Sequence, residues 1–175
     1  MSLTNIQVYN GTPISTLLNT GFAGSTTLLA GAAAQAAPTD FLATRAAQWN
    51  VVLQAYFAAA PTVGATLDLY VAWGTGTGAG YPGGLGVSPA NAYFSGYNTV
   101  ATAGYTSALP QFEYIGSLVC APVAGAQVAQ LGMVTPKLET GVMILVNNTS
   151  VTLGNTAGNL PGIVTFVPIV DEVGV

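Results

Sequence analysis

The sequence is poor in charged side chains. Only two basic and six acidic residues occur among 175, so 5% of the chain is charged, against about 25% in an ordinary soluble domain. A surface built from Thr, Ser, Asn, Gln, Gly and Ala generates little repulsion between molecules and is easily buried against another subunit. We therefore expect a protein that works in a permanent assembly.

Basic residues are the scarcest charged type. The two cations are Arg45 and Lys137, and the net charge is −4. Nucleic-acid-binding proteins need a basic surface that neutralises phosphates. The composition therefore predicts no contact with nucleic acid and favours a protein surface or a neutral glycan as the partner.

The residues that carry most catalytic and metal chemistry are also missing. The chain has no histidine and a single cysteine, Cys120, which excludes an intrachain disulfide and leaves a catalytic thiol without an activating base. Cys120 lies in the apolar run YIGSLVCAPV, which predicts a small buried side chain. No calcium loop and no His/Cys cluster occurs, so we predict no metal ion and no cofactor.

A glycosidase would need two carboxylates that face each other across a cleft. Asp68 and Glu113 lie on different predicted strands and are the pair that can meet, but nothing in the sequence requires it. We predict that the protein is not an enzyme and has no catalytic residues.

Membrane and export signals are absent as well. A membrane helix would need an uncharged apolar run of about 20 residues, and the sequence contains no such run. The start MSLTNIQVYNGT lacks the basic and continuous apolar regions of a signal peptide. We therefore predict synthesis in a cytoplasm without membrane contact, and we interpret the sequons at Asn147 and Asn148 as a polar loop.

Residues 1–38 differ from the rest of the chain. Short apolar clusters are separated by Gly, Thr and Ser, and Pro38 limits the alanine-rich run 32–37 to about one helical turn. We expect an extended N-terminal arm or a short edge strand here, of the kind that packs on a neighbouring subunit. Residues 39–175 are expected to form a single domain.

Apolar and polar residues alternate in the next part of the chain. In residues 47–58, the odd-numbered side chains of Trp49–Phe57 share one apolar face, which predicts a half-buried strand. Residues 66–73 alternate in the same way, with Asp68 and Tyr70 on the more polar face. A short loop rich in Pro and Gly joins the two runs, so we predict an antiparallel hairpin.

Four further runs have the composition of strands, at residues 112–121, 126–134, 142–148 and 163–170. No pattern past the first third of the chain predicts a helix. Several short strands separated by turn signals predict an all-β fold, namely an antiparallel β-sandwich and in particular a jelly roll.

A glycine-rich stretch, GTGTGAGYPGG at 74–84, follows the predicted strand 66–73. A nucleotide-binding turn needs a helix directly after its glycines, because the helix N-terminus holds the phosphate. Pro82 and the glycines that follow forbid such a helix. We interpret residues 74–111 as a long inserted loop without a nucleotide site.

Five aromatic residues of this loop and the only arginine are the candidate contact residues. They are Tyr81, Tyr93, Phe94, Tyr97, Tyr105 and Arg45. The aromatic side chains either pack the loop onto its own sandwich or form an exposed contact surface for a partner. Arg45 either forms a buried ion pair with Asp40 or a C-terminal carboxylate, or it contacts another subunit.

Four short motifs between residues 39 and 173 carry a resemblance to a known family. They are Thr44-Arg45-Ala46, Ala60-Pro61-Thr62, YIGSLV at 114–119 and PIVDEV at 168–173. In these strand and turn motifs the chain resembles small virion proteins of tailed bacteriophages, the head decoration (cement) and capsid fibre proteins. The resemblance implies a β-sandwich with a structural role and brings no catalytic residues.

Our first hypothesis is therefore a capsid decoration protein on the outer head surface of a virion, made in the host cytoplasm. It would bind the major capsid protein and itself, as a homotrimer, with the N-terminal arm reaching a neighbour. The acidic net charge suits the outside of a head better than contact with packaged DNA. The alternative is a fibre or tail-tip module that recognises host-surface glycans through loop 81–105 and Trp73.

Overall fold

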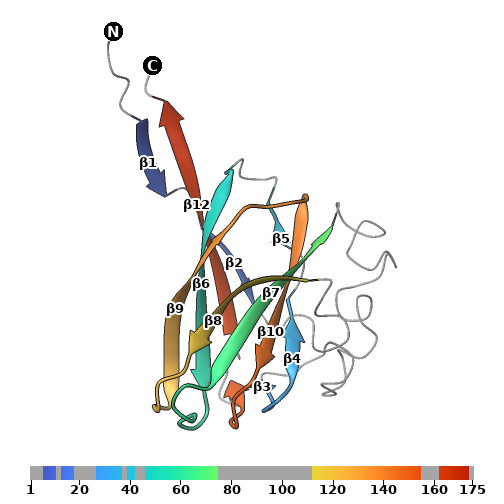
Figure 1. Cartoon of the computed structure of the whole chain (residues 1–175), viewed down its shortest axis with the longest axis vertical. Coiled ribbons are helices and arrows are strands. Elements are labelled where there is room, and N and C mark those ends of the chain that lie inside the picture. The colour runs from blue at the N-terminus through green and yellow to red at the C-terminus, as the bar shows by residue number, and fades with distance from the viewer. Residues whose placement is uncertain are drawn as a thin grey trace.

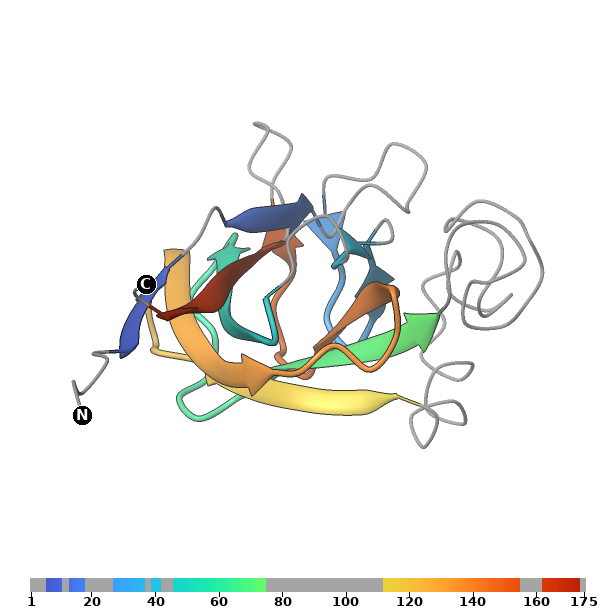
Figure 2. The same cartoon turned by 90° about the horizontal axis from the view of Figure 1, so that it is seen from above.

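The computed structural model describes residues 6–10, 13–17, 27–36, 39–41, 46–74, 112–154 and 162–173. These residues form strands, turns and bends, and none of them lies in a helix; accordingly, none belongs to a helix that could span a lipid bilayer. The strands build two antiparallel sheets that pack against each other (Figure 1; Figure 2). The predicted all-β, antiparallel β-sandwich is confirmed.

One sheet has seven strands. They are β1 (Ile6–Asn10), β2 (Ile14–Leu17), β3 (Thr27–Leu28), β6 (Gln48–Phe57), β9 (Gly125–Val134), β11 (Leu153–Gly154) and β12 (Gly162–Val173). β6 pairs with β12 along one edge and with β9 along the other. β12 in turn pairs with β1 and β2, while β11 connects β6 to β3.

The second sheet has five strands. They are β4 (Ala33–Gln35), β5 (Thr39–Asp40), β7 (Thr66–Gly74), β8 (Glu113–Val119) and β10 (Thr140–Asn147). β10 pairs with β7 on one side and with β4 and β5 on the other. β8 pairs with the far side of β7 and forms an edge of this sheet.

The predicted hairpin between the runs 47–58 and 66–73 is wrong. β6 belongs to the seven-stranded sheet and β7 to the five-stranded sheet, so residues 58–65 cross from one sheet to the other. Each strand has one apolar face, and the two faces meet across the core when the strands lie in opposite sheets. Eight residues at roughly 3.3 Å each easily span the distance of about 10 Å between packed sheets.

The core lies between the two sheets. Trp49, Phe57 and Phe166 come from the seven-stranded sheet, and Leu69 and Met143 come from the five-stranded sheet; all five side chains are fully buried. The whole odd-numbered face of β6 is buried, as the alternation predicted.

β10 is buried on both faces. Its inward Met143 and Leu145 belong to the main core, while its outward Val142, Ile144 and Val146 form a second apolar cluster with Ala72 of β7. The near-continuous apolar sequence of this strand is typical of a central strand that is covered on both sides.

The described parts of residues 1–38 are short strands, which is one of the two forms expected for this segment. β1 and β2 follow β12 in almost continuous register, from Ile6 opposite Val173 to Leu17 opposite Ile163. Figure 1 shows β1 and β12 running side by side at the end where both termini lie. Since β3 and β4 also pair within the sandwich, these strands belong to the two sheets of their own chain.

β8 and β9 come together where the two sheets meet at one side of the sandwich, and they lie next to each other in both views (Figure 1; Figure 2). The pairing of β8 with β7 has a register shift there, near Ile115, and so does the pairing of β9 with β6, near Leu131. A Cβ atom added to Gly116 would lie 2.6 Å from the backbone oxygen of Leu131. Glycine is therefore needed for this close approach.

A buried asparagine fastens the end of β10. The Asn147 side chain is fully buried, and its Nδ2 donates to the carbonyl oxygens of Leu28 (3.4 Å), Leu29 (3.1 Å) and Val151 (2.9 Å). Its Oδ1 accepts from the backbone nitrogen and the hydroxyl of Thr149, at 3.0 and 2.7 Å. Asn147 is therefore a strand residue that holds two loops, and the interpretation of its sequon as a polar loop was wrong.

Candidate functional site

The outer face of the five-stranded sheet carries a group of polar and aromatic side chains where β7 and β8 pair. Because Leu67 and Leu69 point into the core, Asp68 and Tyr70 point outward. The strand register places Ser117 opposite Asp68 and Tyr114 opposite Tyr70. We call Asp68, Tyr70, Tyr114, Ser117 and Asn148 the Asp68 cluster; Asn148 directly follows β10.

Hydrogen bonds fix the carboxylate of this cluster. The Ser117 hydroxyl donates to Asp68 Oδ1, and Asn148 Nδ2 donates to Asp68 Oδ2 at 2.6 Å. Since the Ser117 proton is used in this way, the Tyr114 hydroxyl donates to Ser117 Oγ, at 2.6 Å. The result is a chain from Tyr114 through Ser117 to Asp68 that sets the orientation of all three side chains.

The two tyrosine rings of the cluster contact each other, with centroids 5.4 Å apart and planes tilted by 59°. Tyr70 is half-buried, whereas 53% of Tyr114 is exposed. Burial, followed by the negative charge of Asp68 and then by Tyr114, raises the pKa of Tyr70. An exposed ring therefore lies beside an oriented carboxylate.

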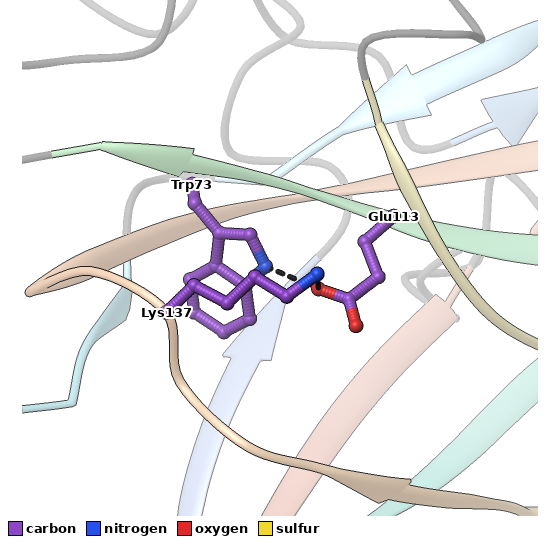
Figure 3. Close-up of polar contacts among 3 residues, drawn as sticks. All are labelled: Trp73, Glu113 and Lys137. Carbon is purple, nitrogen blue, oxygen red and sulfur yellow. Dashed lines mark hydrogen bonds and ion pairs between the residues drawn. The ribbon is translucent and has the colours of Figure 1, made fainter.

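A second polar group lies where β7 ends and β8 begins (Figure 3). Glu113 Oε2 accepts from the indole nitrogen of Trp73 at 2.6 Å and lies 3.1 Å from Lys137 Nζ. The Trp73 ring also packs against Phe41 of the core, with centroids 5.4 Å apart. This group ties the β9–β10 loop to β7 and β8, and an exposed ion pair of this kind contributes about 0–1 kcal/mol.

Asp68 and Glu113 do not meet. Asp68 is on the outer face opposite Ser117, whereas Glu113 is opposite Val71, whose side chain faces the core. The two carboxylates therefore lie on opposite faces of the sheet and cannot act as a glycosidase pair. In the portion of the chain that the structure describes, no three His, Cys, Asp or Glu side chains are grouped so that they could hold a metal ion.

The outer face of the seven-stranded sheet has a different character. The outward side chains that the structure describes on β6, β9 and β12 are Gln48, Asn50, Val52, Gln54, Tyr56, Ala126, Val128, Gln130, Met133, Ile163, Thr165, Val167 and Ile169. None of these thirteen residues is charged, and Val128 and Met133 are 63% and 62% exposed. We call this surface the uncharged face.

All six candidate contact residues lie outside the described residues. They are Arg45, Tyr81, Tyr93, Phe94, Tyr97 and Tyr105. The predicted partners of Arg45 and the two interpretations of the aromatic loop therefore stay predictions. Cys120 is buried, as predicted, and burial raises the pKa of its thiol.

Sequence reasoning placed Asp68 and Tyr70 on one strand face but did not find the rest of the cluster. Tyr114 and Ser117 join it only through the register between β7 and β8, which is shifted by a bulge. Asn148 joins it through the pairing of β10 with β7. No local sequence signal specifies either register.

In comparisons with known proteins, no protein-family model matches the chain, and no curated protein matches it.

Proposed function

We propose that this protein is a structural component of a bacteriophage virion that decorates the outside of the capsid and stabilises it by protein–protein contacts. In this role it binds the major capsid protein and forms a homotrimer. The observation that carries the proposal is the uncharged face.

The absence of charge on this face is unusual for a surface that stays in water. A soluble surface with about 25–35% charged residues would carry about three to five charges on thirteen positions. The uncharged face carries none, and its exposed Val128 and Met133 add apolar area near an edge of the sheet. Such a surface is depleted in the side chains that are most costly to desolvate, as interface cores are.

Two neighbouring features support a docked partner. An open hollow of ≈ 310 Å³ lies at one end of the uncharged face, and the described residues that line it are Ala47, Gln48, Thr135 and Ile169. β9, the outermost strand on this side of the uncharged face, contains no charged residue. A shell protein can therefore bury the described residues of this region without leaving a charged side chain desolvated and unpaired.

A binding experiment with heads that lack the protein tests the proposal. Purified protein should co-sediment with such heads and appear by cryo-electron microscopy in many symmetric copies on their outer surface. The double variant Val128→Lys/Met133→Lys places two charges on the uncharged face and should weaken binding about 100-fold or more. Light scattering on the free protein tests the trimer.

The matched control is Val63→Lys/Val123→Lys, which changes two side chains that are 70% and 53% exposed in loops outside the uncharged face. This control should bind heads as the wild type does. Wild-type protein that fails to bind heads, or a face variant that binds as tightly as the control, would overturn the proposal.

We also propose that the sandwich is a jelly roll. We count β1 with β2 as segment 1, β4 with β5 as segment 2, and β6, β7, β8, β9, β10 and β12 as segments 3 to 8. The seven-stranded sheet then has the segment order 1-8-3-6, and the five-stranded sheet has the order 2-7-4-5. This interleaving supports two Greek keys in one double sheet. An experimental structure with another strand order would exclude it.

The alternative function, glycan recognition at a fibre or tail tip, has lost one of its two supports. Trp73 is only partly exposed, its ring packs on Phe41 and its indole nitrogen is bonded to Glu113. The aromatic loop 81–105 lies outside the described residues. A sugar site is better supported on another part of the molecule.

A further inference from the structure

We infer that the Asp68 cluster is a binding site for neutral glycans, built on the outer face of the five-stranded sheet. Sugar binding here does not depend on the capsid role, because the uncharged face belongs to the other sheet.

The first element of the site is the Tyr114 ring. A pyranose has one face made of C–H groups, and such a face packs on an exposed aromatic ring that has an apolar body and a polar tip. Tyr114 is exposed, but it is not free to rotate, because its ring contacts Tyr70 and its hydroxyl is bonded to Ser117. A ring that is already fixed loses little conformational entropy when a ligand binds.

The second element is the carboxylate of Asp68. Each of its oxygens accepts one hydrogen bond, from Ser117 or from Asn148, and each can accept a second. Two such acceptors side by side match the vicinal hydroxyl groups of a sugar, and hydrogen bonds to a charged acceptor are stronger than neutral ones. Asn148 is exposed and adds an amide oxygen that can accept a further hydroxyl.

The charge of the cluster decides the class of sugar. The cluster contains one carboxylate, that of Asp68, and no cation, so a sulfate, phosphate or sugar carboxylate would be repelled. Lys137, the one cation in the described ranges, is engaged by Glu113. The site is therefore expected to select neutral sugars over acidic ones.

The test uses the full chain on an array that carries neutral glycans ending in galactose, mannose or N-acetylglucosamine, together with sialylated and sulfated glycans. Saturation-transfer NMR with the strongest neutral ligand then gives its affinity. Tyr114→Ala and Asp68→Asn should each weaken binding at least about tenfold, whereas Tyr114→Phe, which keeps the ring, should stay within about fivefold.

The matched control is Tyr56→Ala, which removes a half-buried tyrosine from the outer face of the other sheet and should leave binding unchanged. The thermal midpoint shows whether Tyr114→Ala alters folding. If it does, Asp68→Asn still tests the site, because this change preserves the shape of the side chain. The inference is overturned if no neutral glycan binds at about 10 mM, a limit of about 3 kcal/mol. It is equally overturned if acidic glycans bind better, or if Tyr56→Ala and Tyr114→Ala have the same effect.

Discussion

Replacing Asn147 by alanine is expected to destabilise the protein far more than the same change at Asn148. Asn147 makes four well-formed side-chain hydrogen bonds, with Leu29, Val151 and twice with Thr149, and its side chain is fully buried. At about 0.5–1.5 kcal/mol for each bond, their loss amounts to about 4 kcal/mol. That is a large part of the 5–15 kcal/mol that is typical of a whole domain.

Asn148 is the internal control because it has the same chemistry one position later. It is exposed and donates one side-chain hydrogen bond, to Asp68, so Asn148→Ala should cost about 1 kcal/mol or less. For a chain of this length, 4 kcal/mol corresponds to a decrease in the thermal midpoint of roughly 8–16 °C.

Urea unfolding followed by tryptophan fluorescence measures both variants, because Trp49 is fully buried in the native protein. In N147D the introduced carboxylate would face three carbonyl oxygens, so its pKa should be raised and part of the lost stability should return as the pH falls. An Asn147→Ala variant within about 1 kcal/mol of the wild type, or no worse than Asn148→Ala, would refute the assigned role of this network.

Three further predictions concern other parts of the molecule. Gly116→Ala should lower the free energy of unfolding by about 1–3 kcal/mol, because the added methyl group would collide with the Leu131 backbone; a variant of wild-type stability would exclude the close approach. The buried Cys120 thiol, whose pKa is raised by burial, should react with Ellman's reagent only as fast as the chain unfolds, and prompt labelling of native protein would contradict this. Because the folded pKa of Tyr70 is raised, its contribution to stability is intact below the unfolded pKa of about 10 and is lost as the pH rises through the folded pKa. Urea titrations should therefore show a steeper loss of stability above about pH 10 for the wild type than for Tyr70→Phe, and parallel curves would disprove the linkage.

Strand identity and strand faces could be predicted from the sequence because they depend on local alternation. The odd-numbered side chains of Trp49–Phe57 face the core because a strand with one apolar side can be buried in only one orientation. The runs found as β8, β9, β10 and β12 were predicted from their strand-like composition, which is also a local property of the sequence.

The partner of each strand could not be predicted in this way. The pattern of β6 and β7 is satisfied by a hairpin within one sheet and equally by two strands that face each other across the core, and the molecule has the second arrangement. The bulges near Ile115 and Leu131 then shift the registers by one residue. The Asp68 cluster depends on the register between β7 and β8 and on the pairing of β7 with β10, so it becomes visible only in three dimensions.

The position of β12 bears on how the chain can fold as it is synthesised. This strand lies between β6 and the pair β1/β2, so the earliest and latest described segments are direct neighbours. While residues 162–173 are still inside the ribosome, one edge of β6 is open and β1 and β2 have no strand to join. The five-stranded sheet can form before that point, whereas the seven-stranded sheet must wait for pairings that are remote in sequence and therefore slow. Proteolytic removal of β12 would consequently separate β6 from β1 and β2 in the middle of the sheet, rather than remove a strand at its edge.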